Sequence, residues 1–270
     1  MIYAVVNNKG GAGKSTIAFN CLTAILDNFR LVEIDNNNTT SASFTKSEKL
    51  NGKVKSVKIS QGFDAFDEAI FEMVQDKTCD IIIDAGGGDD SIAVIKLLLR
   101  ESDHNELVFI IPLMTGGGQV DNALDTYELV KDHKVVFVLN ASAAKEDFVF
   151  WNGSKDYELG GVDPKISSLP TTFIRRTDLF DLAGLEKEVI ADTASTAYLY
   201  SSIKDAREDL IQMAKGDMDE YKRLKGRHRI AVDCRDFIEN DLSEFKKVVL
   251  GVSAPIQKST ILTQSAKKPL

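Results

Sequence analysis

The sequence predicts an α/β protein with a mostly parallel, twisted sheet that helices cover on both faces. Three observations predict this fold class: apolar runs alternate with stretches of helical periodicity, most runs are continuously apolar, and unusual polar residues follow several of them. Continuously apolar strands are typical of parallel sheets that are buried on both faces. Because such sheets bind ligands beyond the carboxyl ends of their strands, the polar residues there are candidates for a site.

The composition is that of one large domain. The chain has 270 residues, 43% of them hydrophobic, which is enough for a sizeable core. Its net charge of −8 disfavours a surface that binds polyanions everywhere but allows a local basic patch. The three cysteines are widely spaced, as expected for free thiols in a reducing compartment. Since the first residues lead into a strand, and no apolar run reaches the roughly 20 residues that span a bilayer, we expect a cytoplasmic protein.

The expected elements alternate along the first half of the chain. Strands are predicted for residues 3–7, 31–35, 54–59, 80–84, 107–112 and 135–140. Helices are predicted where apolar residues recur at helical spacing, over residues 17–26, 63–74, 92–100 and 120–131. Residues 141–170 are expected to be irregular.

The last third of the chain is expected to be helical. Helices are predicted for residues 179–190 with a bend near Gly184, for 197–224 as one long charged helix or a helix pair, and for 237–250. We expect a single domain over residues 1–270, with a core to about residue 195, a helical extension over about 196–252 and a loose tail over 253–270.

Residues 9–16 read KGGAGKST and lie between the first strand and the first helix. In G-x-x-x-x-G-K-[ST] loops, backbone N–H groups point at phosphate oxygens, and the helix N-terminus adds its positive end. Lys14 would reach the β- and γ-phosphates, Ser15 would bind Mg²⁺, and Thr16 would hold the α-phosphate, although Asn8 replaces the first glycine of the motif. The residues expected to bind the nucleotide here are Gly10, Gly11, Ala12, Gly13, Lys14, Ser15 and Thr16.

The spacing K-G-G-x-G-K-[ST], with Lys9 ahead of Lys14, resembles the deviant Walker A motif of the ParA/MinD family of P-loop ATPases. The resemblance implies a P-loop NTPase fold that binds ATP and Mg²⁺. It also implies a homodimer that sandwiches two ATP molecules, in which Lys9 reaches the partner's nucleotide and stabilises the charge of the transferring phosphoryl group. The alternative is that Lys9 is a solvated lysine beside the loop.

Two further strand ends carry acidic residues. The buried run IIID ends at Asp84 and resembles the family's Walker B strand, which implies that Asp84 holds Mg²⁺ together with Ser15 and Asp35. The run LVEID resembles the first switch strand, where the family continues D-x-D, but Asn37 stands in the second position. Since Asn cannot take up a proton, we expect hydrolysis that is slow or depends on a partner. The candidate catalytic residues are Lys9, Lys14, Asp35 and Asn37.

The glycines Gly86, Gly87 and Gly88 resemble the family's second switch. The resemblance implies that a backbone N–H near Gly87 senses the γ-phosphate, and glycines let such a loop move. Asp89 and Asp90 are expected to cap the helix that follows.

Asn140 and Pro170 are candidates for binding the base. Asn140 ends a predicted strand and resembles the family asparagine that reads adenine, since its amide can pair with the N6 donor and the N7 acceptor. The alternative is an asparagine that caps a turn at the strand end. Pro170 resembles the family's "IP" turn, which implies that the backbone near it surrounds the base. The resemblance covers roughly residues 1–190 and is strongest at residues 9–16.

Members of this family bind one of two kinds of surface: ParA relatives bind nonspecific DNA, and MinD relatives bind membranes. Basic residues gather in the segment 222–235, namely Lys222, Arg223, Lys225, Arg227, Arg229 and Arg235. We expect this segment to bind DNA phosphates, the alternative being a solvated helix end. Residues 253–270 lack an apolar helical stripe, so we do not expect membrane binding.

The resemblance implies a switch ATPase that partitions or positions plasmid or chromosomal DNA, or another large cargo, in association with the nucleoid. Because no helix-turn-helix precedes the first strand, we expect a separate centromere-binding adaptor protein. Asn37 motivates an alternative, a nucleotide-gated accessory protein with little turnover, as in conjugation or MinD-like positioning. A third possibility is a metabolic P-loop enzyme, but no acceptor site is visible and Lys9 favours the dimer.

Overall fold

The computed structural model describes residues 1–36, 39–58, 68, 71, 78–102, 106–200 and 203–253. Its centre is a seven-stranded sheet with the strand order β3-β2-β4-β1-β5-β6-β7, in which all these pairings are parallel. The strands are β1 (Ile2–Val5), β2 (Phe29–Ile34), β3 (Val54–Val57), β4 (Asp80–Ala85), β5 (Leu107–Leu113), β6 (Lys134–Ser142) and β7 (Thr171–Arg175). The parallel sheet confirms the predicted fold class.

Helices connect the strands and continue beyond the last of them. The first helix is continuous and comprises α1 (Lys14–Thr16), the π-helical residues Ile17–Leu22 and α2 (Thr23–Ile25). The others are α4 (Asp89–Glu101), α5 (Gly117–Val130), α6 (Val149–Asn152), α7 (Pro164–Ser167), α8 (Leu179–Leu185), α9 (Ile190–Ser195), α10 (Ile203–Ala214), α11 (Met218–Asp236) and α12 (Leu242–Ser253).

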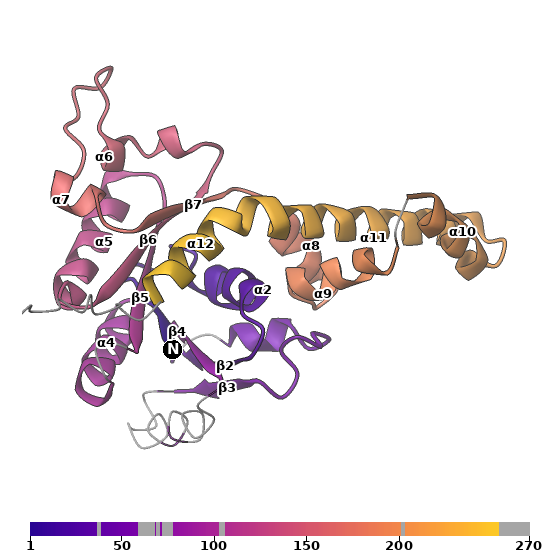
Figure 1. The fold of residues 1–270 in the computed structure, drawn as a ribbon, viewed down its shortest axis with the longest axis horizontal. Helices are drawn as coiled ribbons and strands as arrows, with labels where there is room; N and C mark the ends of the chain where they lie inside the picture. Colours follow the sequence, from indigo (N-terminus) through magenta and orange to yellow (C-terminus); the bar gives the residue numbers. More distant parts are fainter. Residues whose placement is uncertain are drawn as a thin grey trace, which may run out of the picture.

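Side chains of the sheet alternate between two separate hydrophobic cores. In β1, Ala4 belongs to the core that contains Phe109, whereas Tyr3 belongs to the core that contains Phe19 and Phe245. Figure 1 shows α4 and α5 on one side of the sheet and α2 and α12 on the other. Because both faces are buried, the central strands read as continuous apolar runs.

The edge strand β7 is not predicted by the sequence pattern. It pairs with β6, and only Thr172 and Ile174 of its residues are buried. A short strand with one buried face gives a weaker signal than a continuous apolar run. The segment between β6 and β7, expected to be irregular, contains the short helices α6 and α7.

Two predicted helical segments are each divided in the structure. The segment 179–190 contains α8 and only the first residue of α9, and Lys187 between the two helices has a φ of 64°. The segment 197–224 contains α10 and the start of α11, which Gly216 separates with a φ of 86°. The predicted helix over residues 63–74 falls almost wholly outside the described residues, as do residue 59 and the tail beyond residue 253.

The chain returns to the sheet at its C-terminal end. Figure 1 shows α10 far from the sheet and α11 leading back towards it. The π-helical residues Phe237–Asp241 join α11 to α12, whose side chains Phe245 and Val249 are fully buried. In the part of the chain that the structure describes, no helix is both long and apolar enough to cross a lipid bilayer.

Candidate functional site

The phosphate loop joins the end of β1 to α1, and its glycines adopt conformations that other residues avoid. Gly11 and Gly13 have φ values of 76° and 91°, which lie in the left-handed region. A Cβ atom on Gly13 would also lie 2.0 Å from Nδ2 of Asn140 in β6. Glycine at position 13 is therefore required both by the backbone and by the close contact with β6.

The side chain of Lys14 is buried against its own loop. It is 7% exposed, and its Nζ donates to the backbone carbonyls of Asn7 at 3.2 Å and Lys9 at 3.0 Å. Burial lowers the pKa of Lys14, and the nearby carboxylates of Asp84 and Asp35 oppose that shift. A cation held by carbonyl groups beside a helix N-terminus is well placed to meet a phosphate.

Lys9 has an exposed side chain on an anchored backbone. Its N–H donates to Oδ1 of Asn7 at 2.7 Å, and Nδ2 of Asn7 donates to the carbonyl of Pro112 in β5 at 2.6 Å. Asn7 itself is fully buried. The loop therefore presents Lys9 to solvent from a position that is tied to the sheet.

Asp84 is a buried carboxylate near the end of β4. It is 3% exposed and its side chain forms a hydrogen bond with Ser15. Burial raises the pKa of Asp84 to about 7; Glu33 and Asp35 add to the rise, while Ser15 and Lys14 oppose it. Its Oδ1 atom is buried and has no hydrogen-bond partner in the described part of the chain.

This donor set fits Mg²⁺. A buried carboxylate oxygen beside a hydroxyl group offers the hard oxygen ligands that Mg²⁺ prefers, and Mg²⁺ is commonly held by one or two protein oxygens together with substrate phosphates. Asp84 is hydrogen-bonded to Ser15 of the phosphate loop, and Cγ of Asp35 would lie 3.2 Å from a Cβ atom on Gly86, so both acids lie close to this loop. Ser15, Asp35 and Asp84 are thus the residues that would hold the ion.

The glycines after β4 pack against the phosphate loop. A Cβ atom on Gly87 would lie 3.2 Å from Cα of Gly10 and 3.8 Å from Nζ of Lys14. The N–H of Gly88 donates to the carbonyl of Asn8 at 2.9 Å. The two segments therefore touch backbone to backbone, and Gly87 lies beside the phosphate loop.

The expectation that Asp89 and Asp90 cap the following helix is wrong. α4 already includes both residues, and its N-cap, Gly88, makes no side-chain cap. The carboxylate of Asp90 instead accepts hydrogen bonds from the backbone N–H of Asn36 at 3.1 Å and from its side-chain amide at 2.5 Å. A Cβ atom on Gly86 would lie 2.9 Å from this carboxylate, which explains the need for a small residue there. Asp90 thus links the segment after β2 to the segment after β4.

Asn140 is brought to the phosphate loop. It is 4% exposed, and its Nδ2 donates to the carbonyl of Ala12 at 3.2 Å. In this arrangement its amide supports the shape of the loop. Asn37, the candidate for positioning water, lies outside the described residues.

Pro170 is not brought to the phosphate loop. It precedes β7, and its carbonyl accepts a hydrogen bond from Phe137, which lies in the middle of β6. Because parallel strands share one carboxyl edge, the chain that borders the site is the segment after β7 rather than the segment before it. Arg176 begins that segment, and its N–H donates to the carbonyl of Ser142 at 2.7 Å.

Three polar residues that build the site are not singled out by the sequence motifs. Asn7 anchors the loop, and the hydroxyl of Ser91 donates to its carbonyl at 3.0 Å. Glu33 is 1% exposed within β2 and accepts hydrogen bonds from the hydroxyl groups of Ser41 and Ser56. The available signal is a polar residue inside or just after a buried strand.

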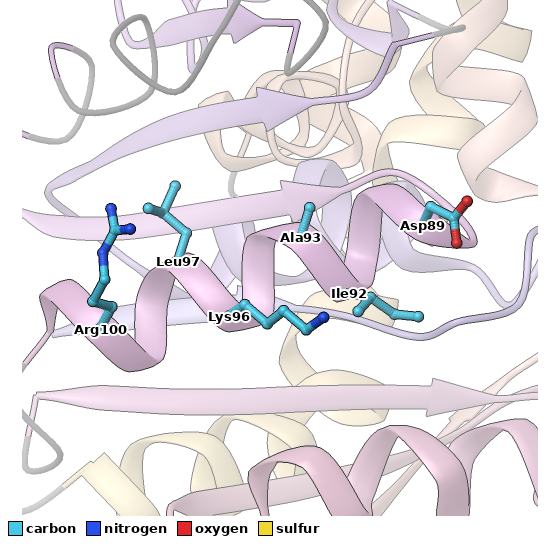
Figure 2. A pocket seen from close by; sticks show the side chains of 6 residues that line it. All are labelled: Asp89, Ile92, Ala93, Lys96, Leu97 and Arg100. Carbon is cyan, nitrogen blue, oxygen red and sulfur yellow. The ribbon is translucent and has the colours of Figure 1, made fainter.

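A hollow of about 340 Å³ runs along α4, directly after the glycines 86–88. Figure 2 shows its lining side chains, which all come from this helix: Asp89, Ile92, Ala93, Lys96, Leu97 and Arg100. No residue of the phosphate loop lines it. The hollow is therefore a surface feature of α4 and not part of the phosphate cradle.

The basic segment 222–235 lies on α11 and is largely paired with acids. The ion pairs are Lys222–Asp219, Arg223–Glu220, Arg227–Glu188 and Arg235–Asp236. All four acids lie outside the segment itself, so its composition overstates its charge. Arg175, the exposed last residue of β7, is likewise paired with Asp241.

A parallel sheet whose central strand leads through a glycine-rich phosphate loop into a helix is the P-loop NTPase fold. No protein-family model and no curated protein sequence matches the chain.

The chain is similar to several solved structures, among them two MinD proteins and an McdA variant. The MinD cell division protein of Aquifex aeolicus is 14% identical, with 83% of this chain and 96% of that chain covered and a TM-score of 0.48. MinD of Pyrococcus horikoshii, complexed with Mg-ADP, is 14% identical, with 94% and 99% covered and a TM-score of 0.42. A Cyanothece McdA variant complexed with ATP is 12% identical, with 85% and 95% covered and a TM-score of 0.44. At these identities the likeness concerns the fold alone.

Proposed function

We propose that the chain is a ParA/MinD-type ATPase that binds ATP with Mg²⁺ and forms a sandwich homodimer in the ATP state. The observation that carries this proposal is the pair of lysines on one phosphate loop. Lys14 is buried with its Nζ on the loop carbonyls, whereas Lys9 is exposed on an anchored backbone. One cation suffices for a bound phosphate, which supports the proposal that the second acts on a nucleotide held by another copy of the chain.

Each residue of the proposed site has a defined role. The backbone N–H groups of residues 10–16 bind the phosphates, and Lys14 neutralises charge on the β- and γ-phosphates. Ser15, Asp35 and Asp84 hold Mg²⁺, which supplies Lewis-acid stabilisation of phosphate charge when bound. Burial of Lys14 and Asp84 strengthens their electrostatic interactions, because little water remains to screen them.

The proposed output is the positioning of DNA or another large cargo through an adaptor protein. The ion pairs along α11 reduce the charge that the segment 222–235 offers to DNA. The proposal therefore rests on the nucleotide-dependent dimer, and DNA is one candidate cargo.

The test measures the mass of the protein by light scattering with ADP–Mg²⁺ and with a non-hydrolysable ATP analogue. The mass is expected to double only with the analogue. Lys9→Ala should bind the analogue but remain a monomer, whereas Lys155→Ala, which alters another exposed lysine, should dimerise normally. Adding duplex DNA at low and moderate salt shows whether the dimer alone retains it.

An unchanged mass with either nucleotide, both for the natural chain and for Lys9→Ala, would contradict the sandwich dimer. In that case the loop serves a monomeric P-loop enzyme. A separate binding assay with a fluorescent nucleotide shows whether the protein binds nucleotide without dimerising or does not bind nucleotide at all.

Asn37 favours a second candidate, a nucleotide-gated accessory protein with little turnover. Replacing Asn37 by Asp restores the carboxylate of the D-x-D pattern and is expected to raise the rate of phosphate release roughly tenfold or more, because a carboxylate can take up the proton of the attacking water. The measurement is steady-state phosphate release with equal analogue affinity in both proteins. A natural chain that already turns over as fast as Asn37→Asp would exclude the low-turnover candidate.

A further inference from the structure

The helix pair α10–α11 carries a groove that the nucleotide site does not use. The groove lies between the two helices and has a volume of about 230 Å³. Apolar side chains of Ala206, Leu210 and Val232 line it, together with the aromatic rings of Tyr221 and His228. It is therefore a mainly apolar depression on a surface helix pair.

Three cations line the same groove: Arg207, Lys225 and Arg229. All three are exposed, and within the described ranges none of them forms a hydrogen bond or an ion pair. Lys222 and Arg223, on the same helix, each have an acidic partner one turn away. No acidic side chain of the described residues lines the groove. A concentrated positive charge thus surrounds an apolar floor, in a chain whose net charge is −8.

We propose that this groove docks an acidic segment of a partner protein, one that places an apolar or aromatic side chain between carboxylates. The floor would bury the apolar side chain, and the three cations would pair with the carboxylates on either side. Arginine and tyrosine are also the residue types that carry much of the binding energy at protein interfaces. Figure 1 shows α10 far from the sheet, so a segment bound there leaves the phosphate loop accessible.

Duplex DNA fits the groove less well than an acidic peptide does. Its phosphates match the cations, but most protein contacts on DNA go to phosphate and sugar, and a duplex presents no apolar side chain to the floor of the groove. DNA affinity also grows with the number of phosphates that are neutralised, and much of the charge on α11 is already neutralised by acids. A peptide complements both the charge and the apolar surface.

The test uses the full chain without nucleotide and measures fluorescence anisotropy with a panel of labelled acidic peptides. All peptides share the same Glu and Asp flanks and differ only in the central residue. Peptides with central Phe, Trp or Leu are expected to bind roughly tenfold more tightly than those with central Ser or Lys. Lys225→Ala and Arg229→Ala should each weaken the best peptide roughly fivefold, whereas Lys222→Ala, a paired cation on the same helix, should leave it unchanged.

A second variant separates shape from charge. Val232→Trp fills the floor without altering any charge, and circular dichroism confirms that it remains folded. It should remove the preference for an apolar central residue. The proposal would be overturned if all peptides bound equally well or if none bound. It would also be overturned if the groove variants lost affinity for duplex DNA while no peptide bound to the natural chain. Because nucleotide is absent throughout, none of these outcomes bears on the ATP-dependent dimer.

Discussion

Single residues of the phosphate site keep charge where little water can reach it. Asp84 is 3% exposed and Lys14 is 7% exposed. Burial raises the pKa of Asp84 to about 7 and lowers the pKa of Lys14. Each charged group has therefore lost hydration that a bound cation or phosphate can replace. In the ligand-free protein, this lost hydration lowers the free energy of unfolding, and a bound ligand would restore it.

Replacing Asp84 by Asn is expected to stabilise the ligand-free protein at pH 8. The folded-state pKa of about 7 lies above the ordinary value of 3.8. The ionised carboxylate therefore lowers the free energy of unfolding above pH 7, and this cost disappears as the pH falls through 7 towards 4. The gain from Asn should be on the order of 2–4 kcal/mol at pH 8 and should vanish near pH 4.

Urea unfolding at both pH values measures this gain. Asp233→Asn, which removes an exposed carboxylate, is the control and should change stability by less than about 0.5 kcal/mol at either pH. A gain for Asp84→Asn that is the same at both pH values would show that burial does not raise the pKa of this carboxyl group.

At the scale of elements, hydrogen bonds join the segments that follow β2 and β4 to each other and to the phosphate loop. Asn36, after β2, is bound to Asp90 in α4, and Gly88, just before α4, is bound to Asn8 in the phosphate loop. If one segment moves, it must therefore either break these hydrogen bonds or move the other segment with it. The structure thus offers a mechanical link between the two proposed switches.

Replacing Asp90 by Ala is expected to lower the free energy of unfolding by about 1–2 kcal/mol, because two hydrogen bonds to Asn36 are lost. Asp89→Ala is a matched control, since it removes an exposed carboxylate from the same first turn of α4. Chemical denaturation of both variants isolates the Asn36 bonds from the effect of helix charge. Equal losses in the two variants would mean that the bonds add nothing.

At the scale of the whole molecule, the C-terminal helix completes the core. α12 packs over β6 and β7, and its residues Leu242, Phe245 and Val249 are fully buried in the core that also contains Phe19. The helix pair α10–α11 projects away from the sheet (Figure 1). In the sequence it lies between β7 and α12, which both belong to the core. The fold therefore combines a closed α/β core, which contains the phosphate loop, with a helix pair that projects from it.

Replacing Phe245 by Ala is expected to lower the free energy of unfolding by about 3–5 kcal/mol, because it leaves a cavity beneath α12. Leu199→Ala provides the control, since Leu199 is 76% exposed and its truncation should cost less than about 0.5 kcal/mol. Thermal and urea unfolding measure both changes. A small effect of Phe245→Ala would mean that α12 folds independently of the sheet.

The sequence by itself determined the fold class and the main motif. Continuous apolar runs predict the buried parallel strands, and the glycines and lysines of residues 9–16 predict the phosphate loop. Both signals are local, because strand burial and loop geometry impose their residue types over a few consecutive positions. Asp84 likewise follows from its place at the end of a buried run.

Only the tertiary structure decided which distant residues meet. Strand order and register bring Asn140 to Ala12 and Asn36 to Asp90. They also place Pro170 at the opposite edge of the sheet from the phosphate loop. The ion pair between Arg227 and Glu188 likewise lowers the net positive charge of a segment that composition alone would assign to DNA binding. Periodicity reports which face of an element is buried, but long-range contacts are chosen by the packing of all elements together, and a local pattern carries no record of that choice.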